Sequence, residues 1–208
     1  MKQKIKAYTE LMKLRLSSLV IYSAVLGYMI APGEIDYLVL VWLSIGGAFV
    51  TGASNAFNQI IERDLDKIME RTQGRPLPSG RLTVNEALIF SIVVGIIGVG
   101  SLFMINGLCA WLGLLAMVLY VLTYTPLKTV TPLSVFVGAI PGSFPPMLGY
   151  VAATASFGLE AGVLFALQFF WQFPHFWAIG WLQFEEYNRA GLHMLPMDKK
   201  VKGAVVQI

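Results

Sequence analysis

The chain has 208 residues, of which 56% are hydrophobic and 13% are charged. Soluble domains carry about 25% charged residues, so this composition excludes an ordinary soluble protein and favours residence in a lipid bilayer. The net charge of +3 is small and requires no nucleic-acid partner, and the single cysteine, Cys109, excludes an intramolecular disulfide.

Six stretches are long and apolar enough to cross the bilayer core, which takes about 20 residues. In chain order they cover residues 16–31, 37–57, 87–106, 108–124, 133–153 and 161–182, and residues 203–208 resemble the start of a seventh span. The first stretch is interpreted as a retained span rather than a cleaved signal, because no small-residue cleavage site follows it. The sequence therefore predicts an all-α, polytopic transmembrane helix bundle, with residues 1–208 as one membrane-embedded domain that is incomplete at its C-terminus.

The distribution of charge orients this bundle. Cytoplasmic loops are enriched in Lys and Arg, so the basic N-terminus and the loops 58–86, 125–132 and 183–203 are expected to face the cytoplasm. All 15 basic residues of the chain then fall on that side. The loops on the other side contain Glu34, Asp36 and Glu160 as their only charged residues. A multi-pass protein of the inner membrane is expected, and its basic face can also attract anionic lipids.

The most informative polar segment follows the second predicted span and covers residues 58–80. If the helix of that span continues through it, an amide and three acids recur every four residues and share one face: Asn58, Glu62, Asp66 and Glu70. Like charges at this spacing repel by about 0.2–0.5 kcal/mol per pair, and a divalent cation would remove the repulsion. Oxygen ligands of this kind suit Mg²⁺, which takes one or two carboxylates together with substrate phosphates.

Basic residues alternate with these acids: Arg63, Lys67, Arg71 and Arg75. Because guanidinium groups bind phosphate oxygens bidentately, acids beside cations indicate a diphosphate site rather than a simple metal site. Asp64 lies about 200° from Glu62 around an ideal helix, so it joins the metal ligands only if the helix unwinds there. The alternative interpretation is a solvated charge run beside a span.

Two further loops on the same predicted side carry candidate residues. Tyr124 and Lys128 flank Pro126; the ammonium group would either contact a phosphate or extend to the lipid headgroups. Glu185 and Glu186 form a second carboxylate pair that would share metal ions with the first cluster across one diphosphate, although such a pair is commonplace by itself.

The fifth and sixth predicted spans have the composition of cavity walls. The fifth is interrupted by glycines and prolines, and a broken backbone at membrane depth is tolerated where protein or water satisfies its polar groups. The sixth is rich in aromatic residues, which can stabilise a cation, so Trp171 is a candidate substrate contact; the alternative is an interfacial aromatic belt. His175 is a second candidate because it is polar inside a span, and the alternative is a packing residue.

Together these segments resemble the UbiA-type intramembrane prenyltransferases, and within them the subgroup that acts on heme. The family motif, an Asn followed by acids at four-residue steps, is met by Asn58, Glu62 and Asp66. Residues 124–128 resemble the family's Tyr/Lys diphosphate-contact segment. Segments similar to the subgroup cover residues 63–72, 75–78, 145–150, 171–178, 185–187 and 195–196. Glu62, Glu185 and Glu186 stand where Asp is common, which keeps the carboxylate but lengthens its arm.

The resemblance implies transfer of a farnesyl group from farnesyl diphosphate to a vinyl group of protoheme IX (heme B), giving heme O, with Mg²⁺ assisting diphosphate departure. It implies catalytic roles for Asn58, Glu62, Asp66 and Lys128, and it makes Asn58, Glu62, Asp66 and Asp64 the metal ligands. The substrate-binding residues that it implies are Arg63, Arg71, Arg75, Tyr124, Trp171, His175, Glu185 and Glu186.

The family fold is a nine-helix bundle, of which this chain would contain six helices and the start of a seventh. Heme A synthase or terminal oxidase assembly factors are the protein partners that the resemblance implies, besides the lipid bilayer itself. Alternatives are another aromatic acceptor (a quinone precursor or a chlorin), an inactive heme-binding membrane fragment, and a transporter. The transporter is disfavoured because carriers usually place ionisable residues inside their spans, whereas here every Asp, Glu, Lys and Arg lies at or outside a span end.

Overall fold

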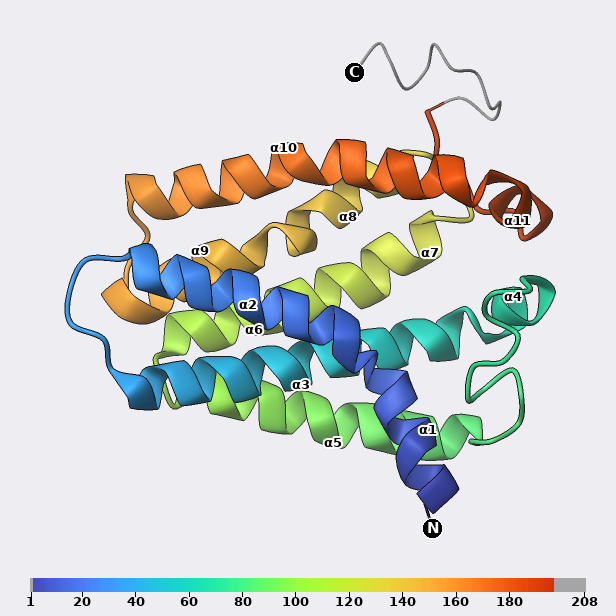
Figure 1. Ribbon diagram of the computed structural model, residues 1–208, viewed down its shortest axis with the longest axis horizontal. Helices are drawn as coiled ribbons and strands as arrows, with labels where there is room; N and C mark the ends of the chain where they lie inside the picture. The colour runs from blue at the N-terminus through green and yellow to red at the C-terminus, as the bar shows by residue number, and fades with distance from the viewer. Residues whose placement is uncertain (1, 197–208) are drawn as a thin grey trace.

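The computed structural model describes residues 2–196, which form helices joined by short loops (Figure 1). In chain order the helices are α1 (Lys2–Met12), α2 (Leu14–Ile30), α3 (Tyr37–Ile61), α4 (Arg63–Ile68), α5 (Val84–Phe103), α6 (Gly107–Val118), the π-helix η1 (Leu119–Tyr124), α7 (Thr125–Leu127), α8 (Ser134–Gly142), α9 (Phe144–Thr154), α10 (Leu159–Leu182) and α11 (Phe184–Arg189). The all-α prediction is confirmed. The predicted seventh span at 203–208 and the cations Lys199, Lys200 and Lys202 lie outside the described residues.

Each of the six predicted spans corresponds to a helix or to a run of consecutive helices. Four are long and apolar enough by themselves to cross a membrane, namely Tyr37–Ile61, Val84–Phe103, Gly107–Leu127 and Ser134–Thr154, and the bent pair of α1 and α2 would be a fifth. Helix α10 matches the sixth predicted span in place and has 24 residues, yet it is not among them. We attribute this to the glutamines, the histidine and the tryptophans in its sequence, which make it less apolar.

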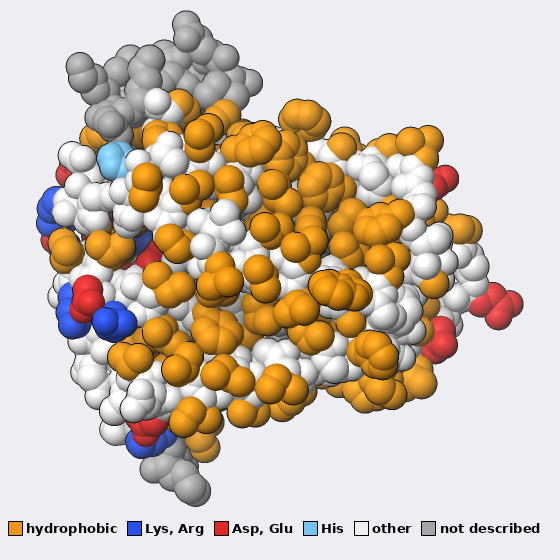
Figure 2. Space-filling view, turned by 180° about the vertical axis from the view of Figure 1, so that it is seen from behind, with side chains coloured by type: hydrophobic (Ala, Val, Ile, Leu, Met, Phe, Trp, Pro, Cys, Tyr) orange, Lys and Arg blue, Asp and Glu red, His pale blue; other side chains and the backbone are white. Residues whose placement is uncertain are grey.

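The helices run side by side between two ends of opposite character (Figure 1). Figure 2 shows Lys and Arg side chains gathered at one end, only acidic side chains at the other, and a broad hydrophobic belt between them. We call the first end the basic end; it carries α1, α4, α7 and α11. This segregation agrees with the charge distribution predicted from the sequence.

The N-terminal segment, predicted only as a basic tail, forms helix α1, and α2 begins at Leu14 rather than at residue 16. The two helices meet at a bend of 43°, where Lys13 adopts the left-handed conformation (φ 48°, ψ 56°). A bend frees backbone carbonyls, and these need partners at membrane depth. Helix α3 supplies them: Gln59 Nε2 donates to the Leu11 carbonyl at 2.9 Å, and Asn55 Nδ2 donates to the Met12 carbonyl at 3.3 Å.

Small residues bring α2 and α9 into backbone contact. A Cβ atom at Gly149 would lie 1.8 Å from the Ala24 carbonyl oxygen, and one at Gly27 would lie 2.0 Å from the Pro146 carbonyl oxygen. No side chain fits at either position, so the crossing depends on glycine. This contact holds the first span against the fifth.

The fifth span is broken, as its composition predicts. Helix α8 contains Pro141 and ends at Gly142, and α9 resumes after Ser143 with prolines in its first turn. The Ser143 hydroxyl donates to the Ala139 carbonyl, and Gln172 of α10 donates to the Gly142 carbonyl at 3.4 Å. Side chains therefore satisfy carbonyls near the break, and α10 is attached to it.

Candidate active site

The predicted stripe of polar residues on α3 and α4 is real as far as Asp66. Helix α3 ends at Ile61, and Glu62 caps it with φ −88° and ψ 6°. The four-residue steps continue, since Glu62 N–H donates to the Asn58 carbonyl at 2.9 Å and Asp66 N–H to the Glu62 carbonyl at 2.8 Å. Asn58, Glu62 and Asp66 are only 2%, 6% and 0% exposed. The prediction is wrong at Glu70, because α4 ends at Ile68 and Glu70 faces solvent, 3.6 Å from Arg189.

Each buried carboxylate has a protein cation beside it. Arg75 Nη1 contacts both oxygens of Asp66, at 2.7 and 2.8 Å. Lys128 Nζ lies 2.5 Å from Glu62 Oε1 and forms an ion pair with it. Lys128 comes from a different part of the chain and is itself buried, so the two predicted groups, acids on one segment and Lys128 on another, meet in space.

The ammonium group of Lys128 stays charged in this setting. Burial by itself would lower the pKa of Lys128, but the neighbouring negative charge of Glu62 raises it above its ordinary value. Its Nζ also lies 4.7 Å from the centre of the Tyr124 ring, within the range of a cation–π contact. The site therefore contains a buried cation next to a carboxylate.

The π-helix η1 places this cation. It ends at Tyr124, two residues before Pro126, which has no N–H to give to the helix. The Thr125 hydroxyl donates to the Tyr120 carbonyl at 2.8 Å and accepts from Asn58 Nδ2 at 3.3 Å. This register turns Tyr124 against α8, where a Cβ at Gly138 would lie 2.5 Å from the ring. Single π-turns of this kind recur at functional sites.

The second carboxylate segment, α11, packs on the first. Met69, Ala190 and Leu192 form a buried apolar cluster with Leu65 and Tyr187, which joins α4 to α11 at the basic end. Glu186 Oε2 is buried and has no hydrogen-bond partner among the described residues, whereas Glu185 is exposed.

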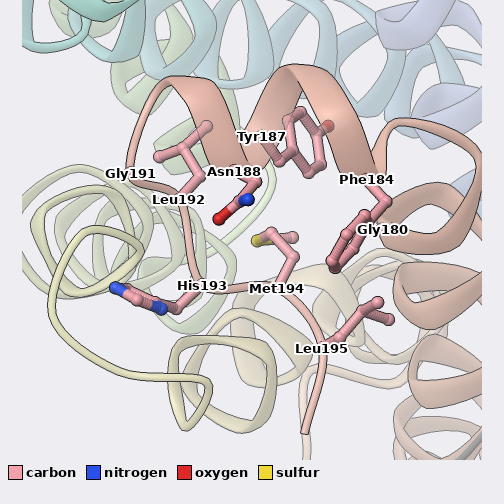
Figure 3. Close-up of a pocket in the computed structure, with 9 residues that line it drawn as sticks. All are labelled: Gly180, Phe184, Tyr187, Asn188, Gly191, Leu192, His193, Met194 and Leu195. Carbon is pink, nitrogen blue, oxygen red and sulfur yellow. The ribbon is translucent and has the colours of Figure 1, made fainter. Parts of the chain in front are cut away.

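The loop after α11 folds back over the basic end. Asn188 and Met194 point into a cavity of about 30 Å³ between this loop and α10, room for a water molecule (Figure 3). The His193 N–H donates to the Lys128 carbonyl at 2.7 Å. The loop thereby fixes the backbone of the residue that carries the buried cation.

Lys13 is a residue that sequence reasoning missed. At the bend between α1 and α2 its charge interacts favourably with Glu62 and Asp66 and unfavourably with Arg75 and Lys128, so it belongs to the same cluster. It was counted only among the cations that orient the bundle. The signal available in the sequence was weak, because nothing in it predicts a left-handed turn at a lysine.

Other predicted site residues lie away from the cluster. Asp64 is exposed and pairs with Lys67 at 3.0 Å and Arg63 at 3.6 Å, and Arg71 is exposed as well. Trp171 and His175 stack on one another, with ring centres 4.8 Å apart, on an exposed face of α10. The condition set for Asp64, local unwinding that would turn it toward Glu62, is not met.

The donor atoms of the cluster suit Mg²⁺, which needs few protein ligands, better than they suit a metal ion that is enclosed by side chains alone. Across residues 2–196, no three His, Cys, Asp or Glu side chains are arranged to enclose a metal ion. Mg²⁺ does not require this, since it takes one or two carboxylates and completes its shell with water and phosphate oxygens. Glu186 Oε2 is a buried acceptor without a hydrogen-bond partner among the described residues, and Glu62 offers a carboxylate whose partner is Lys128. Asn58, whose amide nitrogen faces Thr125, has a carbonyl oxygen to offer.

Residues 20–208 match the UbiA prenyltransferase family. The protoheme IX farnesyltransferase of Flavobacterium psychrophilum is 52% identical over 97% of this chain and 68% of its own length. That of Christiangramia forsetii is 51% identical over 97% of this chain and 67% of its own length.

Solved structures share the fold at lower identity. A structure described as digeranylgeranylglyceryl phosphate synthase in membranes has a TM-score of 0.81 at 23% identity, covering 98% of this chain and 71% of that one. A UbiA homologue from Archaeoglobus fulgidus, bound to DMAPP and Mg²⁺, has a TM-score of 0.71 at 18% identity and covers 89% and 67% of the two chains.

Proposed function

Because the chain belongs to the UbiA prenyltransferase family, we propose that it transfers a farnesyl group from farnesyl diphosphate to a vinyl group of protoheme IX, giving heme O. The observation that carries the proposal is the set of buried Glu62, Asp66 and Lys128 with the partly buried Arg75, at the basic end of a membrane bundle. Such a set can hold a metal–diphosphate head while the apolar chain remains among the helices. The identity of the acceptor rests on relatives about 50% identical to this chain.

The cations of the cluster would bind the diphosphate. In the ligand-free chain, Arg75 and Lys128 neutralise Asp66 and Glu62. When those carboxylates and Asn58 hold Mg²⁺, the two cations become available to phosphate oxygens, as charge-assisted hydrogen bonds require. Lys13, which interacts electrostatically with Glu62 and Asp66, would add a third cation beside the cluster. Bound there, Mg²⁺ would neutralise the charge that develops on the leaving diphosphate.

When the bond between the farnesyl group and the diphosphate breaks, it also leaves an allylic carbocation, and aromatic side chains beside the cluster are suited to stabilise it. The Tyr124 ring lies between Tyr120 and Phe176, with centre distances of 5.2 and 5.8 Å. Aromatic faces stabilise cations. The C–O bond to the diphosphate breaks, the heme vinyl carbon bonds the farnesyl cation, and water adds to the resulting heme-side cation with loss of a proton.

Trp171 and His175 are proposed as contacts of the heme rather than of the diphosphate. They lie on the exposed face of α10, away from Glu62 and Lys128, and a flat stacked pair suits a flat acceptor. We further propose that the basic end faces the cytoplasm, as the positive-inside rule requires, and that Glu185 and Glu186 act on the same metal–diphosphate head. Heme A synthase or oxidase assembly factors would then receive the product.

The test is to incubate membranes containing the protein with protoheme, farnesyl diphosphate and Mg²⁺, and to analyse the heme by mass spectrometry. The expected product is heme that has gained one farnesyl group and one hydroxyl group. Product from a quinone precursor instead would overturn the acceptor.

Two variants test the site assignment. Glu62→Gln and Asp66→Asn should abolish turnover while membrane insertion is retained, and Glu34→Gln, at the opposite end, serves as the matched control with full activity. Full activity in both site variants would exclude these carboxylates as the metal ligands.

A further inference from the structure

An open groove of about 620 Å³ lies at the bend between α1 and α2, outside the cluster described above. Its polar part is lined by Lys6, Glu10, Lys13 and Arg15, and its apolar part by Leu16 and Leu19. The groove is therefore cationic where the chain leaves the membrane and apolar where α2 enters it.

The single acid in the groove does not cancel its positive charge. Glu10 is held by Arg81, with Nη2 2.6 Å from Oε2, so its carboxylate already has a cation from outside the groove. In the described part of the chain, neither Lys6 nor Arg15 has a carboxylate within ion-pair distance. Lys6 and Arg15 thus face an open space with no carboxylate in ion-pair distance, and Lys13, which also interacts with Glu62 and Asp66, lines the same space.

The apolar part continues from these cations into the bilayer. Leu16 and Leu19 are three residues apart, so they share one side of α2, and they are 47% and 66% exposed. Going along α2, a ligand in the groove would meet charge first and aliphatic side chains next. This order matches an amphiphile whose anionic head lies at the membrane surface and whose chain lies within the membrane.

From this arrangement we infer that the groove is a binding site for an anionic phospholipid, with the headgroup phosphate between Lys6, Lys13 and Arg15 and one acyl chain along Leu16 and Leu19. The ligand is a phosphodiester lipid rather than the prenyl diphosphate, because the groove offers a metal only one acid, Glu10, whereas the cluster described above offers Asn58, Glu62 and Asp66. The inference requires only that the protein is embedded in a membrane, not that it is a transferase.

Binding would also affect the active-site cluster. Lys13 lines the groove and, at the same time, interacts with Glu62 and Asp66. A headgroup on the groove side would hold the bend in place and fix where Lys13 stands relative to those carboxylates. The lipid composition of the leaflet would then influence how well the cluster binds a diphosphate.

The test is native mass spectrometry of the purified full chain titrated with phosphatidylglycerol or phosphatidylcholine. Each basic residue near an anionic membrane surface contributes about 1 kcal/mol, or roughly fivefold in binding. The Lys6→Gln/Arg15→Gln variant should therefore bind phosphatidylglycerol about 25-fold more weakly. The control Lys4→Gln/Arg189→Gln removes the same charge from the same end outside the groove and should lose less than about twofold.

Three results would overturn the inference: equal loss in both double variants, equal binding of the two lipids by the unmodified chain, or displacement of phosphatidylglycerol by farnesyl diphosphate without Mg²⁺. If the Gln variant fails to insert, Lys6→Arg/Arg15→Lys decides, since it keeps both charges. It should retain the preference for phosphatidylglycerol over phosphatidylcholine, and loss of that preference would contradict a headgroup site.

Discussion

The ion pair between Lys128 and Glu62 offers a test of how the cluster is built. At 2.5 Å and an effective dielectric constant of about 20, the attraction between the two charges is about 7 kcal/mol before desolvation. Desolvating each ion costs several kcal/mol, so the pair as a whole is close to neutral in net stability. Removing one partner is a different matter, because it leaves the other charge buried alone.

We therefore expect Lys128→Met and Glu62→Gln each to lower the free energy of unfolding, Lys128→Met by about 3–5 kcal/mol and Glu62→Gln by a similar amount. The double variant should be within about 1 kcal/mol of the unmodified protein, because both buried charges are gone. The measurement is unfolding in SDS, followed by tryptophan fluorescence. A matched control is the exposed pair Lys67–Asp64, at 3.0 Å, where the same cycle should show a coupling below about 1 kcal/mol.

Stability and activity should separate in this series. The double variant Glu62→Gln/Lys128→Met folds but lacks both a metal ligand and a phosphate-binding cation, so its turnover should stay abolished. If the double variant lost as much stability as the two single variants added together, the buried pair would be refuted. Recovered activity in the double variant would refute the roles proposed for both residues.

Three further predictions follow from the geometry. Gly149→Ala should destabilise the protein by more than about 4 kcal/mol, since its Cβ would lie 1.8 Å from the Ala24 carbonyl oxygen. The control Gly100→Ala, with open space around it, should be neutral or stabilising by up to about 1 kcal/mol. Equal melting temperatures of the two variants would contradict the α2–α9 crossing. Lys13→Met should raise the KM for farnesyl diphosphate about tenfold, the loss expected for one charge-assisted hydrogen bond, with unchanged melting, and an unchanged KM would remove Lys13 from the cluster. Calorimetry should show that inorganic diphosphate binds at least about tenfold more tightly with Mg²⁺ than without it, a coupling of about 1.4 kcal/mol, because the metal frees the two cations; independent binding would contradict the proposed exchange of partners.

The sequence was sufficient for the bundle and for much of its chemistry. Spans are readable because a bilayer demands long apolar stretches and sorts basic residues to one side. The four-residue spacing placed Asn58, Glu62 and Asp66 on one face, and the backbone hydrogen bonds preserve that spacing through the helix break. The interrupted fifth span was likewise evident from its prolines and glycines.

Other features depend on contacts that no local pattern contains. The stripe stops before Glu70 because α4 is only 6 residues long. Helix α1 and the bend at Lys13 exist because Asn55 and Gln59, far along the chain, satisfy the freed carbonyls. Trp171 and His175 face away from the cluster because α10 directs Phe176 and Gln172 inward instead.

The segment from Asn58 to Asp66 shows the division most clearly. Its sequence alone determined which atoms are available, an amide and carboxylates at helical spacing at a membrane face. Only the tertiary structure decided that Lys128, from the loop after the π-helix, lies against Glu62, and that Arg75 turns back onto Asp66. The physical reason is that spacing along a helix is fixed by the local sequence, whereas the partner of a buried charge depends on which distant segment of the chain packs against it.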